Sequence, residues 1–294
     1  MDHAAMRKQR VWNWRGTVSN RATIGFGTLS LVGPEGWGPP RDPAEAIRVL
    51  RVADELGVCV IDTAEAYGPE LAEELVAKAL WPYDDVFIAT KGGVERSTIA
   101  EWRLDGHPAS LRASCERSLR RLRVETIDLY QLHMPDPTVP LEVSLGCLTE
   151  MQTEGKIRWI GVCNVNRAQL AIASSVCELS SVQNGFNLFD QQAEDILREC
   201  EGLEIPFLAW FPLGGGRLST MGGVLERVAR RHGVPVSVIA LAWILATSKV
   251  AVPIPGTSNA NHLRDDFEAE RVLLSSDEVR ALTRFGNHVS RIRR

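Results

Sequence analysis

Short apolar runs alternate along this chain with longer segments in which apolar residues recur at helical spacing. Eight of the runs predict β-strands, at residues 22–26, 58–61, 86–90, 126–132, 157–162, 181–182, 205–210 and 250–254. The runs Val58-Cys59-Val60-Ile61 and Val86-Phe87-Ile88-Ala89 are apolar at every position. Strands that are buried on both faces have this composition, so the pattern favours a parallel sheet that is covered by helices.

The segments between the strands predict helices. They are expected at residues 43–56, 70–80, 108–122, 141–154, 168–176, 193–200, 222–231, 235–246 and 275–285. The first of them has clear boundary signals, because Asp42 is a good N-cap, Pro43 stands at the first helical position and Gly57 follows the last turn. Eight strand–helix units in this order predict an α/β fold, a (β/α)8 TIM barrel.

No linker rich in proline, serine or glycine divides the chain, so we expect a single domain over residues 1–294, with a small hairpin at about 10–21 across the bottom of the barrel. A doubly wound dinucleotide-binding fold is the alternative. Gly25-Phe26-Gly27-Thr28 supplies the Gly-x-Gly of that fold. The third glycine, and the acidic residue expected about 20 positions later, are missing, which favours the barrel.

Composition narrows the function classes. The formal net charge of −4 gives no indication of a nucleic-acid partner, and the arginines at 117–123 are typical of a solvated helix face. The six cysteines form no Cys-x-x-Cys pair, so we expect neither a metal site nor disulfides. No apolar stretch reaches the roughly 18 residues of a membrane span, and the start of the chain lacks an apolar core. We therefore expect a cytoplasmic protein with no membrane partner.

Chemically active side chains follow three consecutive predicted strands. Asp62, Lys91 and His133 stand at the ends of the second, third and fourth strands, and Tyr67 lies on the loop after Asp62. A barrel enzyme draws its catalytic groups from the carboxyl ends of several strands. We therefore expect these four side chains to converge on one point.

These residues suit proton donation to a carbonyl oxygen. A tyrosine with a pKa near 10 is a weak acid at neutral pH, and a nearby ammonium group such as that of Lys91 favours the phenolate. A buried lysine stays charged only with a partner, here Asp62, and His133 suits a hydrogen bond to the substrate. Considered alone, each residue has an ordinary structural explanation. Asp62 would cap a turn, Tyr67 would pack in a loop, Lys91 would extend to solvent and His133 would lie in the core. Lys91 would also serve a class I aldolase as a Schiff base, but its neighbours favour proton donation.

At these residues the chain resembles the aldo-keto reductase superfamily, and in particular its short bacterial NADPH-dependent members. The similar segments span residues 22–268 in the order of the family. They are Ile61-Asp62-Thr63-Ala64, Tyr67-Gly68, Ala89-Thr90-Lys91-Gly92, Ile127-Asp128-Leu129-Tyr130-Gln131-Leu132-His133, Gly155-Lys156-Ile157-Arg158, Gly161-Val162-Cys163-Asn164, Val182-Gln183-Asn184, Asn187, Pro212-Leu213-Gly214-Gly215-Gly216 and Ile254-Pro255-Gly256-Thr257-Ser258.

The resemblance implies an oxidoreductase in which a hydride passes from the nicotinamide of NADPH to an aldehyde or ketone. Tyr67 would be the general acid, Lys91 and Asp62 would tune it, and His133 would orient the carbonyl of a small-molecule substrate. A cofactor-binding regulatory subunit on the same fold, with little turnover, is an alternative, and a lyase or dehydratase is a third. The sequence leaves the oligomeric state open.

The resemblance also implies where the cofactor binds. Asn164 and Gln183 would hold the nicotinamide carboxamide, and the ring would stack on Phe211. The full set of expected cofactor positions is Gly27, Thr28, Asp62, Cys163, Asn164, Gln183, Phe211, Pro212, Leu213, Gly214, Gly216, Gly256, Thr257, Ser258, His262 and Asp266.

The remaining expectations concern the adenosine 2′-phosphate site and the substrate pocket. His262 and Asp266 replace an arginine and an asparagine of the family, which weakens recognition of the adenosine 2′-phosphate. Thr257, Ser258 and Arg264 still favour NADPH, with NADH as a possible cofactor. For the substrate we expect a pocket of Trp37, Trp102, Tyr67 and His133, formed by the loops at residues 31–40 and 94–106 and by the turn at 134–137. Structural packing of the two tryptophans is the alternative.

Overall fold

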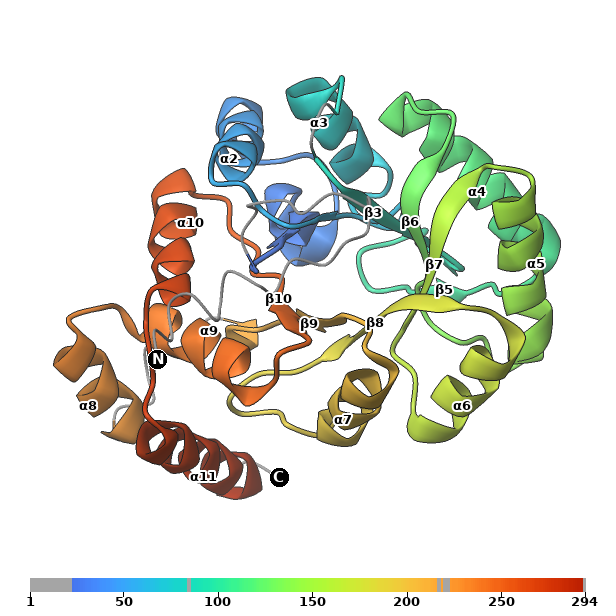
Figure 1. The fold of residues 1–294 in the computed structure, drawn as a ribbon. Helices are drawn as coiled ribbons and strands as arrows, with labels where there is room; N and C mark the ends of the chain where they lie inside the picture. Colours follow the sequence, from blue (N-terminus) through green and yellow to red (C-terminus); the bar gives the residue numbers. More distant parts are fainter. Residues whose placement is uncertain (1–22, 84–85, 216–217, 219–222, 293–294) are drawn as a thin grey trace.

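The computed structural model describes residues 23–83, 86–215, 218 and 223–292, and its centre is a parallel sheet of eight strands (Figure 1). In spatial order the strands are β1 (Phe26–Gly27), β2 (Ile61–Asp62), β3 (Ile88–Gly92), β6 (Ile127–Leu132), β7 (Ile157–Cys163), β8 (Leu179–Gly185), β9 (Phe207–Trp210) and β10 (Ala251–Pro253). Backbone hydrogen bonds from Gly25 N to Pro253 O and from Gly27 N to Pro255 O, each 3.0 Å, join the first strand to the last. The (β/α)8 barrel and its eight strands are confirmed.

Helices surround the strands on the outside (Figure 1). They are α2 (Pro43–Glu55), α3 (Leu71–Leu80), α4 (Pro108–Leu122), α5 (Leu141–Thr153), α6 (Arg167–Val176), α7 (Glu194–Leu203), α8 (Gly223–His232), α9 (Val236–Thr247), α10 (Ala260–Phe267) and α11 (Ser276–Ile292). All the expected helices are confirmed, and Asp42 caps α2 by accepting hydrogen bonds from Ala44 N and Glu45 N. The expected N-terminal hairpin lies outside the described residues.

One α-helix and one two-stranded hairpin were not predicted. Helix α10 is short and mostly polar, so it lacks a helical apolar pattern, although the Asn259 side chain caps it through Asn261 N and His262 N. The antiparallel pair β4 (Val94–Glu95) and β5 (Arg103–Leu104) has strands of two residues, too short for an alternating pattern. This hairpin follows β3 and carries Trp102 toward the carboxyl ends of the barrel strands.

Apolar side chains form two buried clusters. The larger one joins strands and helices, whereas the smaller one consists mainly of side chains on or beside the strands, namely Val60, Phe87, Ala89, Leu129, Leu208, Val252 and Ile254. Layers of strand side chains fill the interior of a barrel of this kind. Within the described ranges no single helix has the length and apolarity to cross a membrane, and only the sharply bent pair of α8 and α9 meets those criteria jointly.

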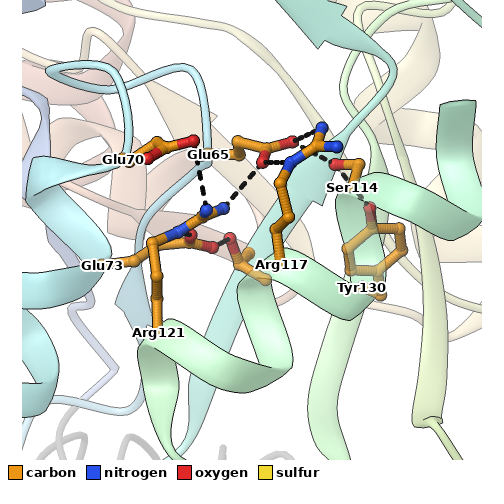
Figure 2. A network of polar contacts seen from close by, with 8 residues as sticks. Glu65, Glu70, Glu73, Ser114, Arg117, Arg121 and Tyr130 are labelled. Atoms are coloured by element: carbon orange, nitrogen blue, oxygen red, sulfur yellow. Dashed lines mark hydrogen bonds and ion pairs between the residues drawn. The ribbon is translucent and has the colours of Figure 1, made fainter.

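A buried network of charged side chains fixes the loop that follows β2 (Figure 2). Glu65, which lies on this loop, accepts hydrogen bonds from Arg117 Nε (2.6 Å) and Arg121 Nη2 (2.7 Å), both on α4. Burial acts to raise the pKa of Glu65, but the hydrogen bonds from Arg117, Ser114 and Arg121 outweigh it and hold the pKa below its usual value. The carboxylate therefore stays ionised and holds the loop against α4.

The same arginine extends the network to the strand that carries Lys91. Arg121 Nε donates to Glu73 Oε2 on α3 (2.7 Å), and Glu73 Oε1 accepts from Thr90 Oγ1 (2.6 Å). The Glu73 side chain is fully buried, and that of Arg121 is 11% exposed. The expectation of a solvated arginine face on α4 is thus wrong for Arg121, because its partners come from other elements of the chain.

Replacing Arg121 should destabilise the fold in a pH-dependent way. In Arg121→Met the fully buried Glu73 carboxylate loses its counter-ion, so we expect the free energy of unfolding at pH 7 to fall by about 3–5 kcal/mol. Burial already raises the pKa of Glu73 above its ordinary value. The folded variant takes up a proton at Glu73 more readily than the unfolded chain, so stability should return as the pH falls toward about 5.

Urea unfolding of Arg121→Met at neutral and mildly acidic pH measures this effect. Arg120→Met is the matched control, because Arg120 lies on the same helix with an exposed side chain and should cost little at either pH. An equal loss for Arg121→Met at both pH values, or an equal loss in the control, would contradict the role of this network.

Candidate active site

A buried ion pair joins the ends of β2 and β3. Lys91 Nζ lies 2.5 Å from Asp62 Oδ1, and the two side chains are 0% and 3% exposed. Lys91 Nζ also donates to Thr63 O (2.9 Å), and Asp62 Oδ2 accepts from Gln183 Nε2 (2.7 Å). A buried pair is tolerated only when such further hydrogen bonds satisfy its remaining polar atoms.

Tyr67 folds back over this pair. Its hydroxyl accepts a hydrogen bond from Lys91 Nζ at 3.2 Å, and the ammonium lies 4.9 Å from the centre of the Tyr67 ring. The His133 ring stands edge-on to the Tyr67 ring, with the centroids 5.8 Å apart. The structure thus brings together the four side chains that were expected to converge, Asp62, Tyr67, Lys91 and His133.

Burial and the neighbouring charges together set the protonation of the site. Although burial acts to lower the pKa of Lys91, the Asp62 carboxylate outweighs it and raises that pKa, so the ammonium stays charged. Burial raises the pKa of Tyr67 above 10.0, and Lys91 opposes this rise without cancelling it. Burial, aided by the charge of Lys91, holds the pKa of His133 well below 6.5.

These directions correct one expectation. The sequence suggested that Lys91 makes Tyr67 more acidic than an ordinary tyrosine, whereas burial wins and Tyr67 remains a neutral phenol at physiological pH. His133 is a neutral imidazole under the same conditions, and its buried Nδ1 has no hydrogen-bond partner among the described residues. The site therefore holds one ammonium, paired with the Asp62 carboxylate, and a phenol proton beside it.

A cavity of about 870 Å³ opens above these residues. Tyr67, His133 and Trp102 line it, while Trp37 is not among its described lining residues. The expected cofactor positions that line it are Gly27, Asp62, Asn164, Gln183, Phe211, Pro212, Leu213, Gly256 and Ser258. Those that do not are Thr28, Cys163, Gly214, Thr257, His262 and Asp266, and Gly216 lies outside the described residues.

Several of the positions that do not line the cavity are buried or bonded to other parts of the protein. Thr28 and Cys163 are fully buried, and burial raises the pKa of Asp266 to about 7. Thr257 Oγ1 accepts a hydrogen bond from Asn259 N (3.1 Å) just before α10. Arg264, which was expected to favour NADPH, forms an exposed ion pair with Glu55 at 3.2 Å.

Trp210 is a lining residue that the sequence reading missed. Its indole Nε1 donates to Asn164 Oδ1 (3.0 Å), and Asn164 Nδ2 donates to His133 O (3.0 Å). Phe211, the expected stacking residue, also lines the cavity. Its ring packs closely against Gly215, because a Cβ on Gly215 would lie only 2.7 Å from Phe211 Cζ. Trp210 was missed because it ends a predicted strand, where an aromatic residue normally packs.

The residues present fit a dinucleotide cofactor. The cavity is within the usual range of about 300–1,000 Å³ for ligand sites, and the amides of Asn164 and Gln183 line it beside Tyr67. Elsewhere in the lining two backbone segments lie close together. A Cβ on Gly256 would lie only 2.8 Å from the carbonyl oxygen of Gly27. Arg41, which was not predicted, supplies the one arginine or lysine among the described lining residues.

Comparison with known proteins supports this assignment. Residues 23–287 match the aldo/keto reductase family. The chain is 40% identical over 260 residues to an uncharacterised oxidoreductase, C215.11c, of Schizosaccharomyces pombe (88% of this chain, 84% of the relative). It is 37% identical over 266 residues to pyridoxine 4-dehydrogenase of Escherichia coli (88% and 93%).

A solved structure agrees with these relatives. An aldo-keto reductase from Klebsiella pneumoniae, determined in complex with NADPH, superposes with a TM-score of 0.76 at 25% identity and covers 90% of each chain. The barrel, the buried Asp62–Lys91 pair beneath Tyr67 and the sequence match lead to one conclusion. This chain belongs to the aldo/keto reductase family.

Proposed function

We propose that this protein is an NADPH-dependent oxidoreductase that reduces the carbonyl group of an aldehyde or ketone to an alcohol. The observation that carries the proposal is the Tyr67 hydroxyl, held 3.2 Å from a buried ammonium at the base of a large cavity. The amide-lined cavity, the family and the NADPH complex of the K. pneumoniae relative support this choice of cofactor.

The side chains have separate roles in this reaction. NADPH, when bound, supplies a hydride to the carbonyl carbon. The phenol proton of Tyr67 passes to the carbonyl oxygen, and the phenolate left behind is stabilised by Lys91, which Asp62 keeps charged. His133 is neutral and orients the carbonyl oxygen beside Tyr67. The reverse oxidation uses the same groups in the opposite direction.

The cavity also indicates which residues would hold each end of the cofactor. Asn164 and Gln183 would bind the nicotinamide carboxamide. We assign the stacking face to Trp210 in place of Phe211, because Trp210 is hydrogen-bonded to Asn164 at this end of the cavity. Gly256, Ser258 and Arg41 would meet the adenosine end, where Arg41 supplies the cation that Arg264 was expected to provide.

The first test is loss of NADPH absorbance with a panel of aldehydes and ketones. Tyr67→Phe removes only the proton donor, so we expect kcat to fall by about a hundredfold or more while the Kd of NADPH changes by less than about twofold. Tyr83→Phe is the matched control, because the Tyr83 hydroxyl bonds Leu122 O at a distance from the cavity. NADPH binding without turnover of any carbonyl by wild type would instead favour a regulatory protein.

A second test separates charge from stability. Lys91→Met leaves the Asp62 carboxylate buried without its cation, so we expect loss of activity and about 3–5 kcal/mol of stability. The double variant Lys91→Met/Asp62→Asn should recover most of the stability by urea unfolding but none of the activity. Activity in either variant would show that the ammonium is not needed for the reaction.

A third test concerns the choice between NADPH and NADH. If Arg41 faces the adenosine 2′-phosphate, Arg41→Gln should raise the Kd of NADPH by about two- to fivefold and leave that of NADH unchanged. Arg264→Gln is the control, because Arg264 is already paired with Glu55. Fluorescence titration of both cofactors measures the difference, and an equal effect of Arg41→Gln on both would reject this assignment.

A further inference from the structure

Arg96 joins two loops beside the cavity. It follows β4, and its Nη1 donates to Gly36 O (2.8 Å) and Glu35 O (3.2 Å) on the loop after β1. Its Nη2 donates to Ile99 O (2.5 Å) within the hairpin. The residue is 8% exposed, so this guanidinium is committed to the protein interior and has no role in the proposed chemistry.

The same guanidinium contacts two tryptophan rings. Its Cζ lies 4.1 Å from the centre of the Trp102 ring and 5.2 Å from that of Trp37. Attraction between a cation and an aromatic face strengthens when water is excluded. Trp37 does not line the cavity, whereas Trp102 lines it and is 42% exposed. Arg96 thus fixes the one aromatic ring of the hairpin that reaches the cavity.

The Trp102 ring lies beside the two residues proposed to contact the substrate carbonyl, His133 and Tyr67. Its ring meets the His133 ring edge-on, with centroids 6.1 Å apart and planes at 89°, and His133 in turn meets Tyr67 edge-on. Apolar side chains from the hairpin and the strand ends complete this part of the lining, namely Val94, Leu104 and Met134. Arg96 lies over one face of the Trp102 ring, so a planar substrate ring beside the carbonyl group would pack against the exposed remainder of this side chain.

The loop that Arg96 grips has little freedom to change. Gly36 has a φ of +71°, and a Cβ there would lie 2.3 Å from Leu29 Cδ1 and 3.4 Å from Arg96 Nη1. Gly36 O also accepts from Gly68 N (2.9 Å), the residue after Tyr67. The loop is therefore fixed to the hairpin by Arg96 and to the Tyr67 loop by its backbone.

We propose that Arg96 is a positioning residue that holds Trp102 as an aromatic platform, and that the site takes carbonyl compounds whose carbonyl is attached to a planar aromatic ring. The inference rests on the proposed function for the place of the carbonyl group, between Tyr67 and His133.

Two aldehydes of similar size test the platform. Benzaldehyde carries a planar ring and cyclohexanecarbaldehyde a puckered one, so the ratio of their kcat/KM values reports on stacking. Comparing this ratio between variants cancels the intrinsic reactivity of the two aldehydes. We expect Trp102→Leu to lower it by about two- to tenfold, mainly through the KM of benzaldehyde, and Trp102→Phe to keep it.

Arg96→Met should lower the ratio as Trp102→Leu does, with the Kd of NADPH unchanged. The matched control is Arg123→Met. Arg123 also lies over a tryptophan ring, that of Trp81, with its Cζ 5.9 Å from the ring centre. This pair lies at the C-terminal end of α4, which leads into the bottom of the barrel, away from the cavity. The control variant should leave the ratio at the wild-type value.

A binding measurement separates failure of this inference from failure of the proposed function. Calorimetry with the unreactive amides benzamide and cyclohexanecarboxamide on the NADP⁺-saturated protein needs no turnover. A preference for benzamide that Trp102→Leu and Arg96→Met both reduce supports the platform even if no aldehyde is reduced. Unchanged preferences in both variants, for the aldehydes and the amides alike, would overturn it.

Discussion

The buried ion pair between Lys91 and Asp62 is the constraint on which the site depends. Two opposite charges at the ends of neighbouring strands tolerate burial only because Thr63, Gln131 and Gln183 satisfy their remaining polar atoms. These partners come from the second, fourth and sixth barrel strands in spatial order, so the barrel itself assembles the pair. Tyr67 then lies beside an ammonium whose side chain is fully buried.

The residues before and after Tyr67 along the chain are both held in place. Two residues before it, Glu65 is bound by arginines of α4, and directly after it, Gly68 exchanges backbone hydrogen bonds with Gly36 and Gly38. The loop after β1 is in turn tied to the hairpin after β3 by Arg96. The proton donor and the proposed substrate wall are thus parts of one connected framework, in which preorganised groups need little rearrangement during reaction.

The sequence predicted the elements whose signals are local. Short apolar runs, two of them apolar at every position, identified the eight strands, and polar residues directly after them identified Asp62, Lys91 and His133. Ion pairs between residues that are far apart along the chain could not be predicted. Arg121 looks like a surface residue in the sequence because its partners Glu65 and Glu73 lie far from it along the chain. Trp37 and Trp102 looked equivalent in the sequence. Arg96 lies over both rings, and only the three-dimensional structure shows that Trp102 lines the cavity and Trp37 does not. Trp210 was likewise hidden by its place at the end of a strand.

The central claim is that burial keeps Tyr67 a neutral phenol beside a charged lysine. The chain has only three tyrosines, so NMR of tyrosine labelled with ¹³C at Cζ can follow each ionisation, with Tyr67→Phe assigning the signal. We expect Tyr67 to remain a phenol at about pH 9, one unit below the ordinary tyrosine pKa of about 10. A phenolate signal from Tyr67 already below about pH 8 would contradict the account, because Lys91 would then outweigh burial.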